Sequence, residues 1–177
     1  MRYVLIYGVI AGALAISLIT ASIAIKSLSH LQSEWFGYLV MLATLSLIFV
    51  AVKRYRDVEC GGVIRFGRAF LLGLGVAVVA GLVYVIGWEL YLAASGGEPS
   101  EVLTSYLNAM LADMRAAGAS EAAIAARRVE MEPYVQAYRN PLSRMLITFS
   151  EIFPVGLLVA VVAALVLRNP RAFPARA

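Results

Sequence analysis

Four long apolar stretches constrain this chain more than any other feature of its sequence. Polar segments of very unequal length separate them, and they cover Tyr3–Ile25, Trp35–Val52, Ala69–Trp88 and Met145–Leu167. A helix needs about 20 residues to cross about 30 Å of hydrocarbon, so each stretch is long enough, the second only just. Only the last stretch contains a charged residue, Glu151. Because 62% of the residues are hydrophobic and stand in such blocks, the composition indicates a membrane-embedded protein.

The predicted fold class is all-α, an integral membrane four-helix bundle with a short extramembrane helical hairpin between spans 3 and 4. We expect one membrane domain over residues 1–177. Its spans lie at about 3–25, 35–52, 69–92 and 145–167, and an outward helical insert lies at about 98–140. The first stretch is expected to stay in the protein as a true span. Its 23 uncharged residues exceed the apolar core of a signal peptide, which has about 7–15.

The distribution of Lys and Arg predicts the orientation of the spans. One side of the alternating spans carries nine of these residues, namely Arg2, Lys53, Arg54, Arg56, Arg65, Arg68, Arg168, Arg171 and Arg176. The other carries six, namely Lys26, Arg115, Arg127, Arg128, Arg139 and Arg144. Basic residues near spans favour the cytoplasmic side, so both termini and the 53–68 loop are expected there. The five basic residues of that loop are candidate contacts with anionic lipids or, alternatively, ordinary interfacial anchors.

The outward insert shows helix start and stop signals. Pro99 is a good first residue of a helix, Gly118 is expected to end that helix, and Ser120 is a candidate N-cap for a second one. Pro133 is expected to kink or stop the second helix. Leu and Met residues recur at three- and four-residue spacing in the first helix, which predicts an apolar stripe that caps the bundle or lies on the outer leaflet. A groove for a partner peptide or a lipid is the alternative.

Small residues recur at four-residue steps in three of the spans. The candidate helix-packing residues are Gly8 and Gly12 in the first span, Gly73, Ala77 and Gly81 in the third, and Gly156 and Ala160 in the fourth. Such residues let helix backbones approach closely, which favours helix association in lipid. We therefore expect the third span to be the central one. Its small-residue face would pack against another span of the same chain or against a second copy.

Two acidic residues lie in or near spans and define a candidate intramembrane polar site. Glu89 is expected near the outer boundary, and Glu151 lies about 24 Å along its helix from the inner end, hence just below the outer surface. Pro154 leaves the carbonyl of Ser150 without its helical partner, and such breaks are common in transporter sites. The alternatives are that Glu89 belongs to an interfacial aromatic belt and that Glu151 forms a salt bridge to Arg144, Arg139 or Lys26.

Several function classes find no support in the sequence. Cys60 and His30 are the only residues of their types, so a thiolate and imidazole metal site is not expected. The motifs of common nucleophilic, metal-dependent and phosphate-binding enzymes do not occur. The net charge of +4 comes mostly from residues that flank spans, so nucleic acid is not an expected partner. We therefore expect no cofactor, no metal and no enzymatic activity.

Three segments resemble a known family. They are GGVIRFGRAFLLGLGVAVVAGLVYVIGWELY (Gly61–Tyr91), the helical excursion after Glu98-Pro99, and FPVGLLVAVVAALVLR (Phe153–Arg168). Together they resemble a bacterial membrane family catalogued as domain of unknown function 4199. The resemblance implies a four-span protein of the bacterial inner membrane and supplies no activity, substrate or cofactor.

Two functional hypotheses follow from the sequence. The first is a non-enzymatic structural or accessory component that binds membrane lipids, a membrane protein partner or a second copy of itself. The alternative is a small transporter that uses Glu89 and Glu151 as a protonatable pair near the outer face.

Overall fold

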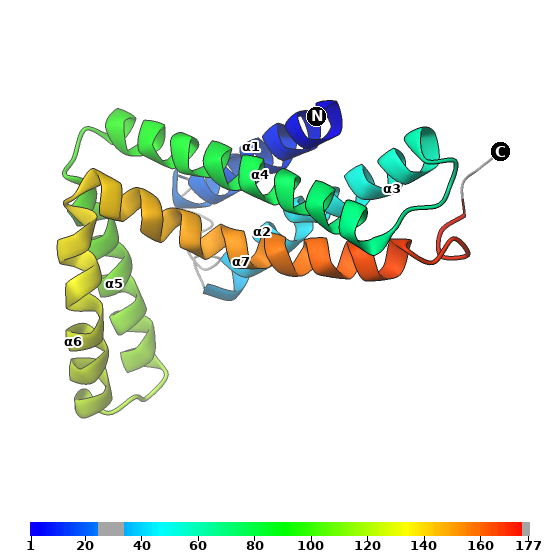
Figure 1. Cartoon of the computed structure of the whole chain (residues 1–177). Helices are drawn as coiled ribbons and strands as arrows, with labels where there is room; N and C mark the ends of the chain where they lie inside the picture. Colours follow the sequence, from blue (N-terminus) through cyan, green and yellow to red (C-terminus); the bar gives the residue numbers. More distant parts are fainter. Residues whose placement is uncertain (25–33, 175–177) are drawn as a thin grey trace. The chain divides into compact units, whose positions relative to one another are not determined.

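The computed structural model describes residues 1–24 and 34–174, and the regular structure in this part of the chain is α-helical throughout (Figure 1). The helices are α1 (Arg2–Ala24), α2 (Glu34–Leu45), α3 (Leu47–Glu59), α4 (Phe66–Ser95), α5 (Pro99–Ala116), α6 (Glu121–Tyr138) and α7 (Pro141–Leu167). The predicted all-α fold class is confirmed. The residues group into two compact units. Unit 1 comprises Met1–Trp88 and Phe149–Ala177, and unit 2 comprises Glu89–Thr148.

Four helical segments are long and apolar enough to cross a membrane. They are Arg2–Ile23, Phe36–Glu59, Phe66–Ser95 and Pro141–Leu167. The third and fourth are longer than their apolar stretches, because α4 begins three residues before the predicted span and α7 begins at Pro141. Hydropathy therefore located the segments, and the helices continue beyond the apolar residues into their polar flanks.

The second span differs most from its predicted range, because its helical segment is interrupted at Ser46 and continues to Glu59. The Ser46 hydroxyl donates to the carbonyl of Ala43 at 2.6 Å, and the Phe49 amide donates to the Ser46 carbonyl at 2.9 Å. A serine side chain that bonds to the preceding turn competes with the regular helical ladder, and this separates α2 from α3. Helix α3 carries on past residue 52, the predicted end of the span, for two turns through charged residues.

In unit 1, glycines of α1 lie directly against α4. A Cβ atom on Gly12 would lie 2.5 Å from the carbonyl oxygen of Ala80, and one on Gly8 would lie 2.6 Å from side-chain atoms of Val79. Real Cβ atoms do not approach other atoms this closely, so these positions accept only glycine without a shift of the backbone. The close approach of α1 to α4 thus depends on the missing side chains.

Another face of α4 packs against α7 in the same way, and the two helices run side by side in Figure 1. A Cβ on Gly73 would lie 3.0 Å from the Cβ of Ala160, and one on Gly156 would lie 2.8 Å from the Cβ of Ala77. Helix α4 therefore lies between α1 and α7, in the central position that its spacing of small residues predicts. The small-residue faces meet within one chain.

Gly81 makes a different contact in the same unit. A Cβ on Gly81 would lie 2.6 Å from the ring of Phe149, so the glycine makes room for an aromatic side chain of α7. Gly75, which the spacing argument leaves out, lies against Val4 of α1. Helix α4 thus uses glycines on more than one face.

In unit 2, α5 and α6 form an antiparallel hairpin whose turn matches the sequence signals (Figure 1). Gly118 has a φ of +82°, and the Ala119 amide donates to the Met114 carbonyl at 3.0 Å, which is the bonding pattern of a glycine-terminated helix. The Ser120 hydroxyl accepts from the Ala123 amide at 3.2 Å. The predicted helix end at Gly118 and N-cap at Ser120 are confirmed.

Of the two outcomes predicted for Pro133, a kink or a stop, the stop is wrong. Helix α6 continues through Pro133 to Tyr138. A proline inside a helix frees the carbonyl four residues earlier, here that of Val129. Both residues are exposed, so this carbonyl is free to bond to solvent, and the helix tolerates the missing hydrogen bond.

The apolar stripe of α5 faces α6 and forms the core of the hairpin. Leu107 and Leu111 of α5 and Ile124 of α6 are at least 95% buried, and Met110 and Met131 pack against them. The sequence predicts that this stripe caps the bundle or lies on the outer leaflet, but it packs against the second helix of the same insert.

Candidate functional site

Glu89, one of the two acids of the predicted polar site, forms an ion pair with Arg144 inside unit 2. The Arg144 guanidinium donates to the two carboxylate oxygens of Glu89 at 2.8 and 2.5 Å, which is a bidentate arrangement. It also donates to the backbone carbonyl of Tyr138 at 2.9 Å. Arg144 is only 6% exposed. The ion pair therefore joins the last part of α4 to the first turn of α7 and to the end of α6.

This ion pair changes the interpretation of both residues. The sequence leaves two interpretations of Glu89 open, a group of an intramembrane polar site or a member of an interfacial aromatic belt, and it offers Arg144 as one possible partner of Glu151. In the structure, Arg144 binds Glu89 instead. The signal that could have found the pair is their shared position, since Glu89 follows the apolar stretch of one span and Arg144 directly precedes that of the next, antiparallel span. The guanidinium of Arg144 neutralises the Glu89 carboxylate, so Glu151 is the one acid of the predicted protonatable pair that this ion pair does not engage.

Glu151 belongs to unit 1 and lies on the outward face of α7. Its side chain is exposed, as are Ser150 and Pro154, and Pro154 lies within the continuous helix. Within residues 1–24 and 34–174, Glu151 makes no hydrogen bond or ion pair. Lys26, one of its predicted partners, lies outside the described residues. Glu151 is thus a carboxylic acid on the surface of a helix that is long and apolar enough to span a membrane.

The face of α7 that continues from Glu151 toward the end of the helix is apolar. Leu158, Val162 and Leu165 are exposed there, at helical spacings that put them on the same face as Glu151. Leu158, two helical turns after Glu151, is 60% exposed. An apolar stripe of this kind suits contact with lipid or with another membrane helix, and Glu151 is the exception within it.

The predicted contact of Arg56 with anionic lipid is wrong, because this side chain is buried. Its side chain is fully buried in unit 1 and donates to the backbone carbonyls of Leu167 at 3.4 Å, Ala172 at 2.9 Å and Phe173. It also donates to the carboxylate of Asp57 at 2.8 Å. The free carbonyls at the end of a helix attract cations, and here the guanidinium satisfies the carbonyls at and beyond the end of α7. Arg56 is therefore a clamp on the C-terminal segment and is not available to lipid.

The other four predicted lipid contacts lie closer to the surface. Lys53 is partly engaged, because its ammonium group pairs with Asp57 at 2.5 Å, and Arg54 donates to the hydroxyl of Tyr7 at 3.3 Å. Arg65 and Arg68 are exposed. These two line a recess of about 460 Å³ together with Cys60, Val63 and Ile64. A role in binding anionic lipid stays a prediction for these four residues.

The described residues contain no cluster of three or more His, Cys, Asp or Glu side chains that could hold a metal ion. Of the residues of the predicted polar site, Glu89 belongs to unit 2, and Ser150, Glu151 and Pro154 belong to unit 1.

These features define a class. Four apolar helices of spanning length, packed through small residues, make the chain a multi-pass helical membrane protein. The sequence profile of the family described as "Protein of unknown function (DUF4199)" matches residues 6–169, and the chain belongs to this family. No curated protein and no solved structure matches the chain significantly.

Proposed function

We propose that this protein is a non-enzymatic accessory component of the bacterial inner membrane that binds a partner membrane protein through the outward face of α7. In this proposal both termini face the cytoplasm, as the distribution of basic residues predicts. The observation that carries the proposal is the exposed carboxylate of Glu151 on an otherwise apolar helix face.

An ionised carboxylate is costly at this position. A charged side chain costs about 2.5–3.5 kcal/mol at the centre of a membrane helix on insertion scales, and less toward the boundary near which Glu151 is expected. Such residues usually face a protein interior and pair with another group. Glu151 faces outward and has no such partner in the described part of the chain. A Lys or Arg side chain from a partner's membrane helix at the same depth would offset the cost. The geometry therefore supports a helix-to-helix contact that depends on charge.

The packing of the small-residue faces also favours the face of α7 that carries Glu151 as the partner-binding surface, because the other candidate surfaces are already covered. Gly8, Gly12, Gly73 and Gly156 all lie against helices of their own chain. These faces are therefore occupied. The outward face of α7 carries both exposed apolar side chains and a polar group that lacks a counterpart, and this combination suits a specific partner better than lipid.

Site-specific photocrosslinking tests this proposal. A photoreactive amino acid at Leu158 reports on the face that carries Glu151. The matched control position is Leu71, which is 67% exposed on α4. We expect a discrete adduct from position 158, loss of that adduct with Glu151→Gln, and retention with Glu151→Asp. An adduct that persists unchanged with Glu151→Gln, or equal adducts from positions 158 and 71, would overturn the proposal.

The small transporter is the second candidate, and the exposed acid beside Pro154 is the observation in its favour. The Glu89 half of its protonatable pair is already bound to Arg144, which weakens it. Proteoliposomes with an internal pH-sensitive dye distinguish the two candidates. A transporter would lose proton-coupled flux with Glu151→Gln and keep normal expression, whereas an accessory component would show no such flux in either form.

A further inference from the structure

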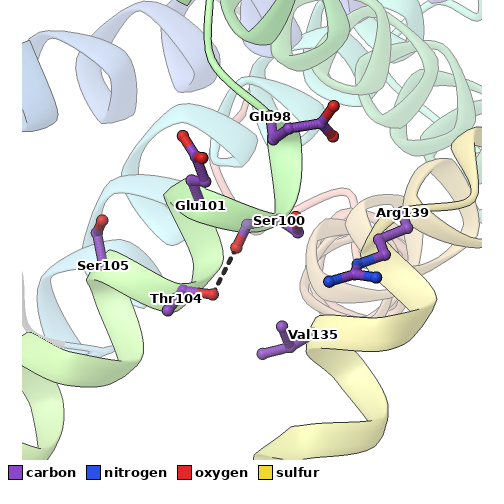
Figure 2. A pocket seen from close by; sticks show the side chains of 7 residues that line it. All are labelled: Glu98, Ser100, Glu101, Thr104, Ser105, Val135 and Arg139. Carbon is purple, nitrogen blue, oxygen red and sulfur yellow. Dashed lines mark hydrogen bonds between the residues drawn. The ribbon is translucent and has the colours of Figure 1, made fainter.

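A polar recess lies between the beginning of α5 and the end of α6, entirely within unit 2. Its volume is about 710 Å³. Figure 2 shows the side chains that line it, which are Glu98, Ser100, Glu101, Thr104 and Ser105 on the α5 side and Val135 and Arg139 on the α6 side. Drug-sized ligands occupy pockets of about 300–1,000 Å³, so the recess is large enough for a small polar ligand.

The three charged side chains of the recess have no ion-pair partners among the described residues. Glu98, Glu101 and Arg139 take part in no ion pair there, although they line the same space. Elsewhere in the same hairpin, acids and arginines do pair. Arg115 binds Glu121 at 3.0 Å, and Arg127 binds Glu130 at 2.9 Å. The recess therefore holds separated positive and negative groups that remain available to a ligand.

Ser100 provides a second, independent observation. It is 91% buried and lines the recess, yet its hydroxyl makes no hydrogen bond to the described residues. The neighbouring Thr104 hydroxyl instead donates to the backbone carbonyl of Ser100 at 2.7 Å (Figure 2). The Ser100 hydroxyl oxygen is accessible from the recess, where it can bond to a ligand or to water.

The location of the recess indicates where such a ligand comes from. Helix α5 begins at Pro99, shortly after α4 ends at Ser95, and Arg139 lies two residues before the first residue of α7. Both α4 and α7 are of membrane-spanning length. The headgroup layer is about 5–8 Å thick on each side of the hydrocarbon. The recess thus lies along the chain next to two span ends, where lipid headgroups are the most concentrated polar molecules.

We propose that this recess binds a zwitterionic ligand that carries a primary ammonium and a phosphate, namely the headgroup of phosphatidylethanolamine. The ammonium group donates hydrogen bonds to the carboxylates of Glu98 and Glu101, and the phosphate accepts from the guanidinium of Arg139. The hydroxyl of Ser100 bonds to the same headgroup. This site is separate from the face of α7 that carries Glu151, and neither assignment depends on the other.

The residue types also predict selectivity. A quaternary ammonium has no N–H group to donate and is usually bound by aromatic rings, and no aromatic side chain lines the recess. A phosphatidylcholine headgroup therefore fits poorly. A phosphatidylglycerol headgroup has no cation, so two carboxylates would face it without compensation. The order expected is phosphatidylethanolamine, then phosphatidylcholine, then phosphatidylglycerol.

Lipid binding to the full chain in detergent micelles, measured by native mass spectrometry with the three lipids at matched acyl chains, tests this order. We expect about tenfold tighter binding of phosphatidylethanolamine than of phosphatidylcholine, which corresponds to the loss of charge-assisted hydrogen bonds. Glu101→Gln and Arg139→Gln should each reduce the preference by about fivefold or more. The matched controls are Asp113→Asn on α5 and Arg128→Gln on α6, which are exposed residues outside the recess and should keep the preference.

Three results would overturn the proposal. The first is equal binding of the three lipids. The second is a preference that survives both Glu101→Gln and Arg139→Gln in variants whose circular dichroism matches that of the parent. The third is competition by free phosphoethanolamine at the concentration at which the lipid binds, which would assign the recess to a soluble ligand. Photocrosslinking at position 158 is a separate readout, so failure here leaves the α7 proposal unchanged and the reverse also holds.

Discussion

The two units of this protein use different chemistry to hold helices together. In unit 1, α4 meets α1 and α7 through glycine and alanine, and backbone atoms come close. In unit 2, α5 and α6 bury Leu107, Leu111 and Ile124 between them. Lipid offers no hydrophobic gain for helix association, so close packing must contribute there, whereas apolar burial stabilises a hairpin whose other faces carry exposed charges. Solvent chemistry thus decides which side chains can hold two helices together.

Two buried arginines extend this comparison. Arg56 in unit 1 is satisfied mainly by backbone carbonyls at and after the end of α7, and Arg144 in unit 2 is satisfied mainly by the carboxylate of Glu89. Each joins segments that are distant in the sequence. A buried guanidinium requires acceptors for its several N–H groups, so both act as structural clamps and neither is free to bind lipid or substrate.

Leu111→Ala should have the largest effect and should act on unit 2. Removing a buried leucine side chain costs about 3 kcal/mol of unfolding free energy through lost burial and the remaining cavity. Hydrogen exchange in detergent would show faster exchange across residues 99–138 and little change in residues 66–88. The control Val129→Ala, at a position that is 73% exposed, should change the free energy of unfolding by less than about 0.5 kcal/mol. Equal effects of the two variants would contradict the assigned core.

Arg144→Gln should follow, because it leaves the Glu89 carboxylate without its cation. Breaking a buried pair costs about 3–5 kcal/mol. Since the Glu89 side chain is 20% exposed, we expect a smaller loss of about 2 kcal/mol. Arg144→Lys keeps the charge and loses the bidentate geometry, so its loss should be intermediate. Unfolding in a denaturing detergent measures both. A lysine variant that is no better than the glutamine variant would show that charge is not the cause.

Gly12→Ala should be milder and should act on unit 1. The new methyl group would meet the carbonyl of Ala80, and overpacking of this kind costs about 1–2 kcal/mol. Gly37→Ala is the matched control, because nothing lies within 4 Å of its added Cβ. That variant should gain up to about 1 kcal/mol from the helix propensity of alanine. A stabilising Gly12→Ala would mean that α1 and α4 are not closely packed there.

The smallest effect concerns pH at the tip of the hairpin. Hydrogen bonds from Arg115 lower the pKa of the Glu121 carboxyl below its ordinary value. A lowered pKa in the folded state means that this pair contributes stability above the ordinary pKa and loses it as the pH falls through the lowered one. In Arg115→Gln the pKa of Glu121 should rise toward its ordinary value, as measured by carboxyl ¹³C NMR. Arg128→Gln is the control, and an unchanged pKa in Arg115→Gln would contradict the pairing.

Local signals in the sequence predicted local structure well. Apolar length located the four spanning helices, and Gly118 and Ser120 marked the turn of the hairpin. These signals act over a few residues, since a helix end needs only a left-handed residue or a capping hydroxyl. Pro133 does not stop the helix, because the carbonyl that it frees lies at an exposed position and is open to solvent.

The interaction partners of the polar residues could not be predicted from the sequence. Glu89 and Arg144 lie 55 positions apart, and Arg56 and Phe173 lie 117 apart. Their partners depend on which helices become neighbours, and nothing in the local sequence specifies that. The polar recess also could not be predicted from the local sequence, because Glu101 and Arg139 line one space only after α5 and α6 have packed together.

The amino-acid sequence alone determined that this is a membrane protein, and it determined the helical class, the number of spans and the turn of the hairpin. These depend on hydropathy and backbone preference, which each short segment carries by itself. Only the tertiary structure decided which charged groups are neutralised and which remain available. Electrostatic pairing depends on distances between side chains, and those distances exist only once the helices have packed.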